Sequence, residues 1–158
     1  MKTVGGRRDL VAGMLAGIGG AIAIGTMEWL SIAAGYPLAV IPFATSIVLI
    51  IGSPEAAPAQ PRALIGGHLV SALTGLAVLS LTGPLAWAAA AAVGLAILTM
   101  VLTDTFHPPA GISPLLIVSG DLPWSFLLAP VLTGVLLLAG FAYAWHRLVS
   151  RRPWPRRS

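Results

Sequence analysis

Long runs of apolar residues, separated by short polar or proline-rich stretches, make up most of the chain. A helix that crosses a bilayer requires roughly 20 apolar residues. Four runs are long enough for such a helix, at about residues 9–34, 62–82, 84–104 and 123–147. The pattern of hydrophobic positions therefore predicts four full transmembrane helices.

Two further apolar stretches are too short to cross a bilayer as helices, and both are interrupted by prolines. The first is YPLAVIPFATSIVLII at residues 36–51, and the second is HPPAGISPLLIVSG at residues 107–120. Proline removes a backbone donor and forces the preceding residue out of the helical region. Each stretch is therefore expected to cross only as an extended piece that leads into a half-helix.

The two halves of the chain repeat one order of segments. Residues 9–82 and residues 84–147 each consist of a long helix, a proline-broken segment and a second long helix. A unit with an odd number of crossings is inverted relative to its copy, and paired broken helices are typical of a transporter's midplane site. We expect a single all-α integral membrane domain over residues 1–158, with six membrane segments, four full helices plus two half-helices, arranged as two inverted repeats. An arrangement with four spans and two re-entrant segments remains open.

The composition agrees with a membrane protein. Hydrophobic residues make up 57% of the chain, charged residues only 9%, and the mean hydropathy is +0.92. A soluble domain has about a quarter of its residues charged. The chain has no cysteine, which excludes disulfides, thiolate metal sites and thiol nucleophiles. Any chemistry must use histidine, carboxylate, hydroxyl or backbone groups.

The net charge of +4 comes from basic residues that lie at the ends of the apolar runs. Cytoplasmic loops of membrane proteins collect Lys and Arg. Six crossings that begin inside would place every Lys and Arg on the cytoplasmic side, including Arg62 and the basic tail at residues 148–158. We therefore expect a multi-pass protein of the plasma (inner) membrane with both termini cytoplasmic. The basic clusters suit the anionic headgroups of a lipid bilayer, and no nucleic-acid partner is expected.

The two broken segments supply the candidate binding site. Half-helix N-termini near residues 44–46 and 111–113 would present free N–H groups and a partial positive charge, and such ends bind anions. The residues that would contact a small inorganic anion are Thr45, Ser46, His107, Pro108, Pro109, Gly111 and Ser113. The alternative is that the hydroxyls and neighbouring carbonyls satisfy these helix ends and that nothing is bound.

His107 stands directly before Pro108 and Pro109, at the second break. Imidazole titrates near neutrality, and ionisable residues within a membrane are functional candidates by default. His107 is therefore a candidate for a switchable positive charge that favours anion entry. Asp104 lies within reach of His107 if the preceding helix continues that far. The alternative is a histidine that only braces the Pro-Pro turn.

Two other ionisable residues interrupt the apolar helices and are candidates for a proton or gating role. Glu28 lies late in the first helix, where solvation near the membrane surface is the alternative. His68 follows Gly66 and Gly67, which permit close helix approach, so a packing role with one interhelical hydrogen bond is the alternative. The histidines and acidic residues show no recognised ligand spacing, so neither a metal nor another cofactor is expected.

Aromatic and small residues indicate structural roles. Four aromatic side chains are expected to anchor the protein near the membrane surface: Trp124, Trp145, His146 and Trp154. Small residues recur in AGMLAGIGGAIAIG, GGHLVSALTG and AAAAAVGLA. They support tight helix packing, either within one chain or in a homo-oligomer.

The stretches FHPPAG at residues 106–111 and SPEAAPAQPRALIGGH at residues 53–68 together resemble the HPP family of small integral membrane proteins, which is named for its His-Pro-Pro motif. The resemblance extends from about residue 8 to residue 148. The chain has Ile112 where the family more usually has Ala, and Ala63 and Leu64 replace a frequent Asn-Val. Members in cyanobacteria and plant chloroplasts are implicated in nitrite transport, so the resemblance implies nitrite as the substrate. The matched residues of the second stretch are Pro58, Ala59, Gln60, Pro61, Arg62, Gly66, Gly67 and His68.

Three functional hypotheses follow from these observations. The first is a transporter or channel for a small anion, with nitrite as the best candidate, bound near the midplane at the half-helix N-termini. The second is a membrane-embedded enzyme that uses His107 and Asp104, although a third catalytic group is not apparent. The third is an accessory membrane subunit without a site of its own. We prefer the first hypothesis and expect no enzymatic activity.

Overall fold

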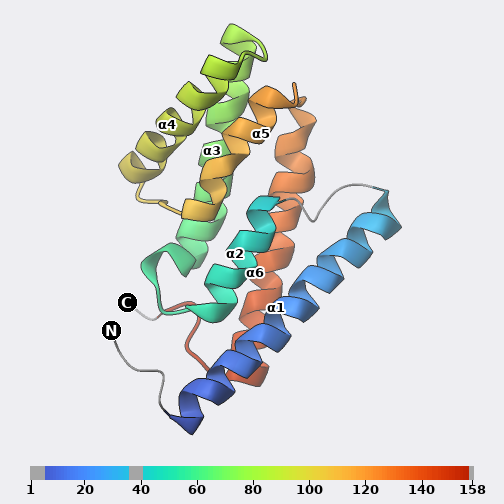
Figure 1. The fold of residues 1–158 in the computed structure, drawn as a ribbon, viewed down its shortest axis with the longest axis vertical. Coiled ribbons are helices and arrows are strands. Elements are labelled where there is room, and N and C mark those ends of the chain that lie inside the picture. Colours follow the sequence, from blue (N-terminus) through green and yellow to red (C-terminus); the bar gives the residue numbers. More distant parts are fainter. Residues whose placement is uncertain (1–5, 36–40, 157–158) are drawn as a thin grey trace.

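The computed structural model describes residues 6–35 and 41–156, and over these residues the chain is a bundle of helices without a strand (Figure 1). Its α-helices are α1 (Arg7–Ala34), α2 (Ile41–Gly52), α3 (Pro61–Thr82), α4 (Ala86–Leu102), α5 (Ser113–Ser119) and α6 (Thr133–Trp145). Short 3-10 or π-helical turns extend or connect them: η1 (Ala57–Ala59), η2 (Pro108–Ile112), η3 (Leu127–Leu132) and η4 (His146–Ser150). The expected all-α architecture is confirmed.

Among the described residues, 3 helical stretches are long and apolar enough to cross a membrane: Asp9–Ala34, Pro61–Thr82 and Leu127–Ser150. The last one joins η3, α6 and η4, and it bends at Ala129, whose φ of −137° and ψ of 120° are not helical. The fourth expected span is shorter than predicted, because α4 has 17 residues. At 1.5 Å per residue, α4 is about 26 Å long, which is the lower limit for a transmembrane helix.

The two proline-containing segments form short helices. α2 has 12 residues, and the residues before it, 36–40 with Pro37, lie outside the described part of the chain. In the second segment, residues 105–107 are not helical, and η2 and the 7-residue α5 follow. His107 has an extended backbone, with φ −130° and ψ 95°, because a residue before proline is pushed out of the helical region. The predicted extended piece that leads into a short helix is present in this segment.

Each short helix packs against one helix of its own half of the chain and one of the other half. α2 contacts α1 and α6, whereas α5 contacts α4 and α3 (Figure 1). Glycines permit these close contacts: a Cβ at Gly134 would lie 2.5 Å from the ring of Phe43, and one at Gly75 would lie 2.8 Å from Cα of Pro114. Small residues therefore set the distances between α6 and α2 and between α3 and α5, as expected.

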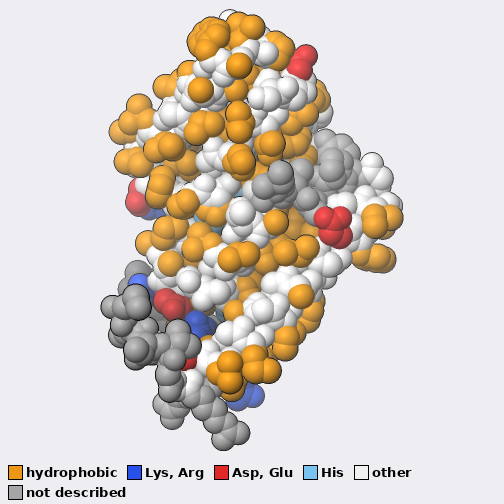
Figure 2. Space-filling model, viewed as in Figure 1, with side chains coloured by type: hydrophobic (Ala, Val, Ile, Leu, Met, Phe, Trp, Pro, Cys, Tyr) orange, Lys and Arg blue, Asp and Glu red, His pale blue; other side chains and the backbone are white. Residues whose placement is uncertain are grey.

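The outer surface of the bundle is apolar. Leu81, Ile32 and Leu102 are 85%, 80% and 75% exposed, and hydrophobic side chains are spread over the whole length of the face in Figure 2. An apolar surface of this extent fits contact with lipid rather than with water. The Lys and Arg side chains visible in Figure 2 lie at its lower left, on the side where α3 begins and the chain ends in Figure 1.

Candidate functional site

Three buried polar side chains from three separate segments meet in the apolar interior. Ser46 lies on α2, His68 lies on α3, and His107 directly precedes η2; their exposed fractions are 0%, 1% and 0%. Ser46 Oγ lies 2.9 Å from Nε2 of His68 and 2.8 Å from Nε2 of His107. The centroids of the two imidazole rings are 5.2 Å apart. We call these three residues the histidine–serine cluster.

Two backbone carbonyls also take part in the hydrogen bonds of this cluster. The Ser46 hydroxyl donates to the carbonyl oxygen of Pro42 at 2.7 Å, and Nδ1 of His107 donates to the carbonyl oxygen of Pro58 at 2.7 Å. Nδ1 of His68 is buried and has no hydrogen-bond partner among the described residues. Such an unpaired buried atom is rare in proteins and costs stability. The cluster therefore calls for an explanation beyond packing.

Local sequence explains how the cluster forms. The buried positions 43, 46, 47 and 50 of α2 recur at helical spacing, which turns Ser46 toward the interior. Gly67 lets the chain before η2 lie directly on α3, since a Cβ there would be 2.6 Å from Cβ of His107 and 2.7 Å from the Thr105 carbonyl oxygen. The close approach predicted at this glycine pair is confirmed. Its partner is the loop at residues 105–107 rather than another helix.

The end of the chain holds the loop that supplies the Pro58 carbonyl. Trp154 is 5% exposed, and its Nε1 donates to the carbonyl oxygen of Ala59 at 2.8 Å. We call residues 151–156 the C-terminal strap, because they lie along the loop at residues 53–60. The strap therefore positions the backbone group that accepts the hydrogen bond of His107.

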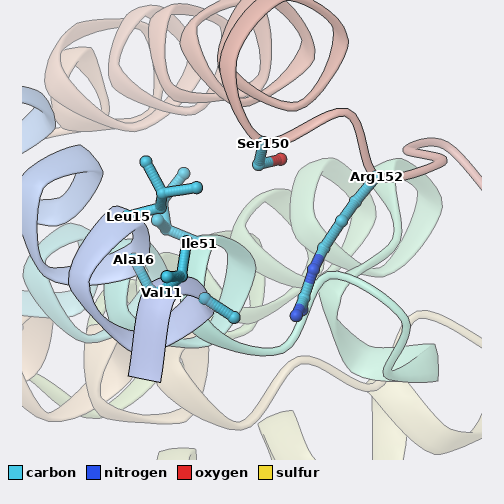
Figure 3. Close-up of a pocket in the computed structure, with 7 residues that line it drawn as sticks. Val11, Leu15, Ala16, Ile51, Ser150 and Arg152 are labelled. Atoms are coloured by element: carbon cyan, nitrogen blue, oxygen red, sulfur yellow. The ribbon is translucent and has the colours of Figure 1, made fainter. Parts of the chain in front are cut away.

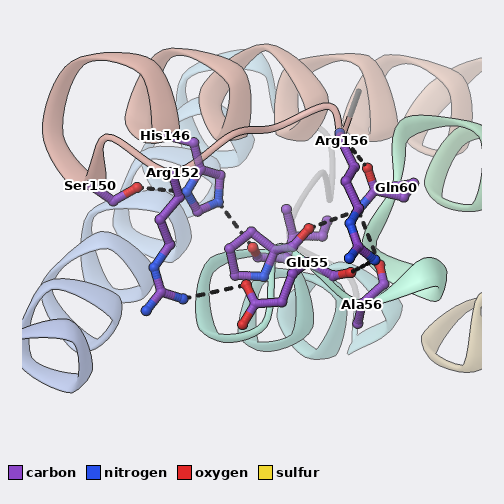
Figure 4. A network of polar contacts seen from close by, with 9 residues as sticks. Glu55, Ala56, Gln60, His146, Ser150, Arg152 and Arg156 are labelled. Carbon is purple, nitrogen blue, oxygen red and sulfur yellow. Dashed lines mark hydrogen bonds and ion pairs between the residues drawn. The ribbon is translucent and has the colours of Figure 1, made fainter. Parts of the chain in front are cut away.

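A third buried histidine, His146, lies beside the C-terminal strap (Figure 4). Nε2 of His146 lies 3.0 Å from the carbonyl oxygen of Ile50, and its Nδ1 lies 2.8 Å from Oγ of Ser150. Arg152 and Glu55 form an ion pair at 3.4 Å. These contacts join the end of the chain to α2 and to the loop that follows it.

Three of the four side chains that were expected to anchor the protein at the membrane surface are buried. His146, Trp154 and Trp145 are 0%, 5% and 9% exposed. Their expected role at the membrane surface is therefore wrong, because they fill the space between α1, α2 and the C-terminal end. Trp124 is 54% exposed, as expected of an anchor. A tryptophan near basic residues is typical of an interface anchor. Trp145 and Trp154 are such residues, but the packing of the C-terminal segment against the bundle buries them.

Asp104 does not contact the histidine–serine cluster. α4 ends at Leu102, and Asp104 adopts a left-handed conformation with φ 53°, so the helix does not continue as the expected contact with His107 requires. Oδ2 of Asp104 instead lies 2.9 Å from Nη1 of Arg62, in an ion pair whose side chains are 83% and 68% exposed. The acid that the enzyme hypothesis paired with His107 therefore lies at the surface.

Glu28 lies near the cluster but does not touch it. It lines a cavity of about 30 Å³ together with residues of α1 and α2 that include Phe43. The ring of Phe43 also packs on His68, with their centroids 4.8 Å apart. Phe43 therefore forms a wall between the cavity beside Glu28 and the histidine–serine cluster.

The expected helix start near residues 44–46 is wrong, whereas α5 begins at Ser113, within the expected range of residues 111–113. α2 begins at Ile41, so Thr45 and Ser46 lie in its second turn. At the second position η2 runs directly into α5, and the N–H of Ser113 donates to the carbonyl oxygen of Ala110. At the second position a local hydrogen bond therefore occupies the Ser113 N–H, where a free N–H group was expected.

The remaining residues of the expected anion site lie apart from the cluster. Thr45 is exposed, and its hydroxyl donates to the Pro42 carbonyl at 3.0 Å. Pro108 and Gly111 line an apolar groove on the outer surface, with Pro109 half-buried beside it. Ser113 is 2% exposed at the start of α5. The structure thus brings together Ser46, His68 and His107 from the expected set.

A larger cavity, of about 510 Å³, opens between α1, the end of α2 and the C-terminal strap (Figure 3). Val11, Leu15 and Ile51 contribute apolar surface to it, and Ser150 and Arg152 contribute polar groups. None of its lining residues belongs to the histidine–serine cluster. Over the described part of the chain, no group of three His, Cys, Asp or Glu residues could hold a metal ion.

Comparisons with known proteins place the chain among membrane proteins. The family model for the HPP transmembrane region matches residues 6–155. Two transmembrane proteins of Dictyostelium discoideum are each 36% identical to the chain over 121 residues, which is 72% of this chain. The aligned region is 42% of one relative and 39% of the other, so the chain spans about two fifths of their length. No solved structure matches the chain.

Proposed function

Because this chain belongs to the HPP transmembrane family, we propose that it forms a membrane pathway for a small inorganic anion, with nitrite as its preferred substrate. The observation that carries the proposal is the histidine–serine cluster, in which His68 and His107 share the hydroxyl of Ser46 within the apolar interior. The choice of nitrite rests on the resemblance carried by the His-Pro-Pro motif.

A polar cluster in the apolar interior lowers the stability of the fold, so its presence favours a functional role. An unpaired buried polar group costs about 1–3 kcal/mol, and apolar side chains would fill the same space without that cost. Ionisable groups inside membrane proteins mark ion pathways and proton relays. The imidazole of His107 carries a positive charge once it binds a second proton, and this charge suits an anionic substrate. The proposed contacts therefore come from His107, His68 and Ser46 rather than from helix N-termini.

Access to the cluster runs past Phe43 on one side. The cavity beside Glu28 ends at this ring, so an anion that enters from that end has to displace Phe43. On the other side the loop at residues 53–60 closes the cluster through the Pro58 carbonyl. Movement of these two elements in turn would give alternating access to one site.

The two halves of the bundle, α1 to α3 and α4 to α6, form inverted repeats in this proposal. The reciprocal packing of α2 on α1 and α6, and of α5 on α4 and α3, supports this arrangement. The end that carries the strap and Arg62 faces the cytoplasm, as the distribution of basic residues favours. Because the chain has no cysteine, Ala57→Cys should react with an impermeant reagent only from the cytoplasmic side. Ser119→Cys should react only from outside, and labelling of both from one side would contradict the topology.

The pathway acts by binding and transport and not by catalysis, and it works as a homo-oligomer. Asp104 is paired with Arg62 instead of His107, so the acid–base pair of the enzyme hypothesis is not assembled. On α1, a Cβ at Gly13 or Gly17 would have no neighbour within 4 Å, which leaves this small-residue face available to a second copy. Cross-linking of a Gly13→Cys variant in membranes tests the oligomer, and a monomeric product alone would contradict it.

Uptake into proteoliposomes tests the function. Vesicles that contain the purified chain are compared with empty vesicles for uptake of nitrite, nitrate, formate and chloride. Nitrite uptake should exceed that of the other anions, and Ser46→Ala should reduce it. Ser71→Ala is the matched control, because the Ser71 hydroxyl is equally buried but donates to the Ala110 carbonyl outside the cluster. Absence of uptake of any of these anions above empty vesicles would contradict the proposal.

A further inference from the structure

The histidine–serine cluster has more hydrogen-bonded contacts than its neutral side chains have protons. Four contacts each require one proton, and they join Ser46 to His68, Ser46 to His107, Ser46 to the Pro42 carbonyl, and His107 to the Pro58 carbonyl. A serine and two neutral histidines carry one polar hydrogen each. Three protons therefore serve four contacts, and one contact is left without a proton.

The geometry identifies where a fourth proton fits. Carbonyl oxygens can only accept, so Nδ1 of His107 donates to Pro58, and the Ser46 hydroxyl donates to Pro42. Ser46 Oγ then accepts from Nε2 of His68 and can accept one more hydrogen bond, which Nε2 of His107 provides only when it is also protonated. A proton on Nδ1 of His68 would find no acceptor among the described residues. The position for the additional proton is therefore Nε2 of His107.

The Ser46 hydroxyl has one orientation for each protonation state. When the cluster is neutral, the hydroxyl turns to Nε2 of His107, and the oxygens of Ser46 and Pro42, 2.7 Å apart, face each other without a proton. The Pro42 carbonyl then keeps the hydroxyl of Thr45 as a donor at 3.0 Å. When His107 binds the fourth proton, the Ser46 hydroxyl turns back to Pro42 and every contact is satisfied. Ser46 thus couples proton binding to a rearrangement of the cluster.

His146 provides a balanced case in the same molecule. Its Nε2 faces the Ile50 carbonyl and therefore carries a proton, so its bare Nδ1 accepts from the Ser150 hydroxyl. Two contacts are served by two protons, and neutral His146 needs no other. The shortage of protons is therefore a property of the cluster around His107 and not of every buried histidine–serine contact.

A proton on His107 creates a positive charge without an acidic partner. The elements packed around it carry no ionisable side chain toward it except His68: α2, α4, η2 and α5 have none within their bounds. The neighbouring acids Asp104 and Glu55 pair with arginines at the surface. An uncompensated charge in an apolar interior is costly. A bound anion offsets this cost, and the proton in turn stabilises the anion.

We infer that the histidine–serine cluster binds one proton with each anion, so that the pathway is a one-to-one proton–anion cotransporter with the Ser46 hydroxyl as its switch. The identity of the transported ion rests on the proposed function, but the proton count of the cluster does not. The proton binds Nε2 of His107 from one side of the membrane and is released from the same nitrogen to the other side of the membrane. No net charge crosses the membrane in one cycle.

Nitrogen-15 NMR of the imidazoles in the purified full chain tests the proton count without transport. The chain has three histidines, so His→Gln variants assign every signal. On acidification His107 should gain a second protonated nitrogen while His146 still has one. Ser46→Ala removes a hydrogen bond to a charged group and should weaken binding of the second proton roughly 10- to 100-fold, whereas Ser71→Ala should leave it unchanged. A His107 with one protonated nitrogen at every pH at which the chain is folded would overturn the inference.

Transport under imposed gradients tests the stoichiometry. If the anion moved alone, a potential of about 100 mV would change its accumulation ratio roughly 50-fold. For a one-to-one cotransporter the accumulation ratio should not depend on the membrane potential, and nitrite should accumulate about tenfold for each unit of pH gradient. Empty vesicles report the passage of undissociated nitrous acid through the lipid. Accumulation that follows the potential would overturn cotransport and leave anion transport intact, whereas absence of uptake would overturn the proposed function and leave the proton count to the NMR experiment.

Discussion

His107 and His146 are both fully buried, and each contacts one serine hydroxyl and one backbone carbonyl. They differ in what else the serine contacts. Among the described residues, Ser150 Oγ is hydrogen-bonded only to His146, whereas Ser46 also contacts His68 and the Pro42 carbonyl. The number of protons therefore matches the number of contacts at His146 and is one too small at His107.

Under the proposed function, this difference separates a structural histidine, His146, from a functional one, His107. A fully satisfied buried network gives a rigid, specific arrangement, whereas an incompletely satisfied one is costly. His146 ties the end of the chain to α2 with every hydrogen bond complete. His107 lies where two proline-containing segments meet, in a network that is completed only by an added proton. The same residue types thus form a complete hydrogen-bond network at His146 and an incomplete one at His107.

The largest effect is expected from disrupting the loop that places His107 on α3. Gly67→Ala would put a Cβ 2.6 Å from Cβ of His107 and 2.7 Å from a backbone oxygen, and the resulting overpacking should cost about 1–3 kcal/mol and abolish nitrite uptake. Thermal unfolding in detergent and uptake into vesicles measure both. Gly94→Ala is the control, since a Cβ there has no neighbour within 4 Å. Full stability and uptake in Gly67→Ala would contradict the close contact.

Exchange of each histidine for glutamine tests the comparison directly. His107→Gln should lower nitrite uptake about tenfold or more, equivalent to about 1.4 kcal/mol, and should abolish the rise in uptake at acidic pH, because glutamine cannot take up the proton. His146→Gln should keep the pH profile and lose about 1–3 kcal/mol of stability through its disturbed hydrogen bonds. The measurements are uptake against pH and thermal unfolding. If nitrite uptake depended on pH in the same way in both variants, the proposed difference between His107 and His146 would be contradicted.

A smaller effect is expected from the C-terminal strap. Trp154→Phe removes the hydrogen bond to the Ala59 carbonyl and should cost about 1 kcal/mol, while the pH dependence of uptake stays intact. Trp124→Phe, at a side chain that is 54% exposed, is the control and should change stability less. If Trp154→Phe removed the pH dependence as His107→Gln should, the strap would belong to the functional site.

The smallest effect is expected at the surface ion pair beside the cluster. Asp104→Asn breaks a contact between side chains that are 83% and 68% exposed, and exposed pairs contribute less than about 1 kcal/mol. Stability and the pH profile of uptake should both remain close to those of the unmodified chain. An altered pH profile would place Asp104 on the proton path and contradict its assignment as a surface residue.

Much of the fold could be predicted from the chain alone. Apolar runs predicted the spans, because a bilayer requires a minimum apolar length, and Pro108 and Pro109 predicted the break before η2, because proline acts on its immediate neighbours. The His-Pro-Pro motif predicted the family. For the candidate site, the sequence indicates His68, His107 and Ser46, because polar residues in apolar sequence stand out.

The partners of those residues could not be predicted. Ser46 was expected at a helix end with backbone N–H groups, and instead its side chain joins two imidazoles from other segments. Asp104 was expected beside His107. Its left-handed backbone conformation turns the chain away from His107, and Asp104 pairs with Arg62 instead. His146 was expected at the membrane surface and is buried. Each of these outcomes depends on which distant segment packs against the residue.

What the sequence by itself determined was local: helix, break, apolar length and the kind of group available at each position. The tertiary structure decided which apolar faces meet other helices and which meet lipid, and so which polar groups come together. Hydropathy cannot separate these two environments, because lipid chains and a protein interior are equally apolar, and packing of small residues decides between them. The convergence of Ser46, His68 and His107, and with it the missing proton, exists only once Gly67 has let the loop before η2 lie on α3.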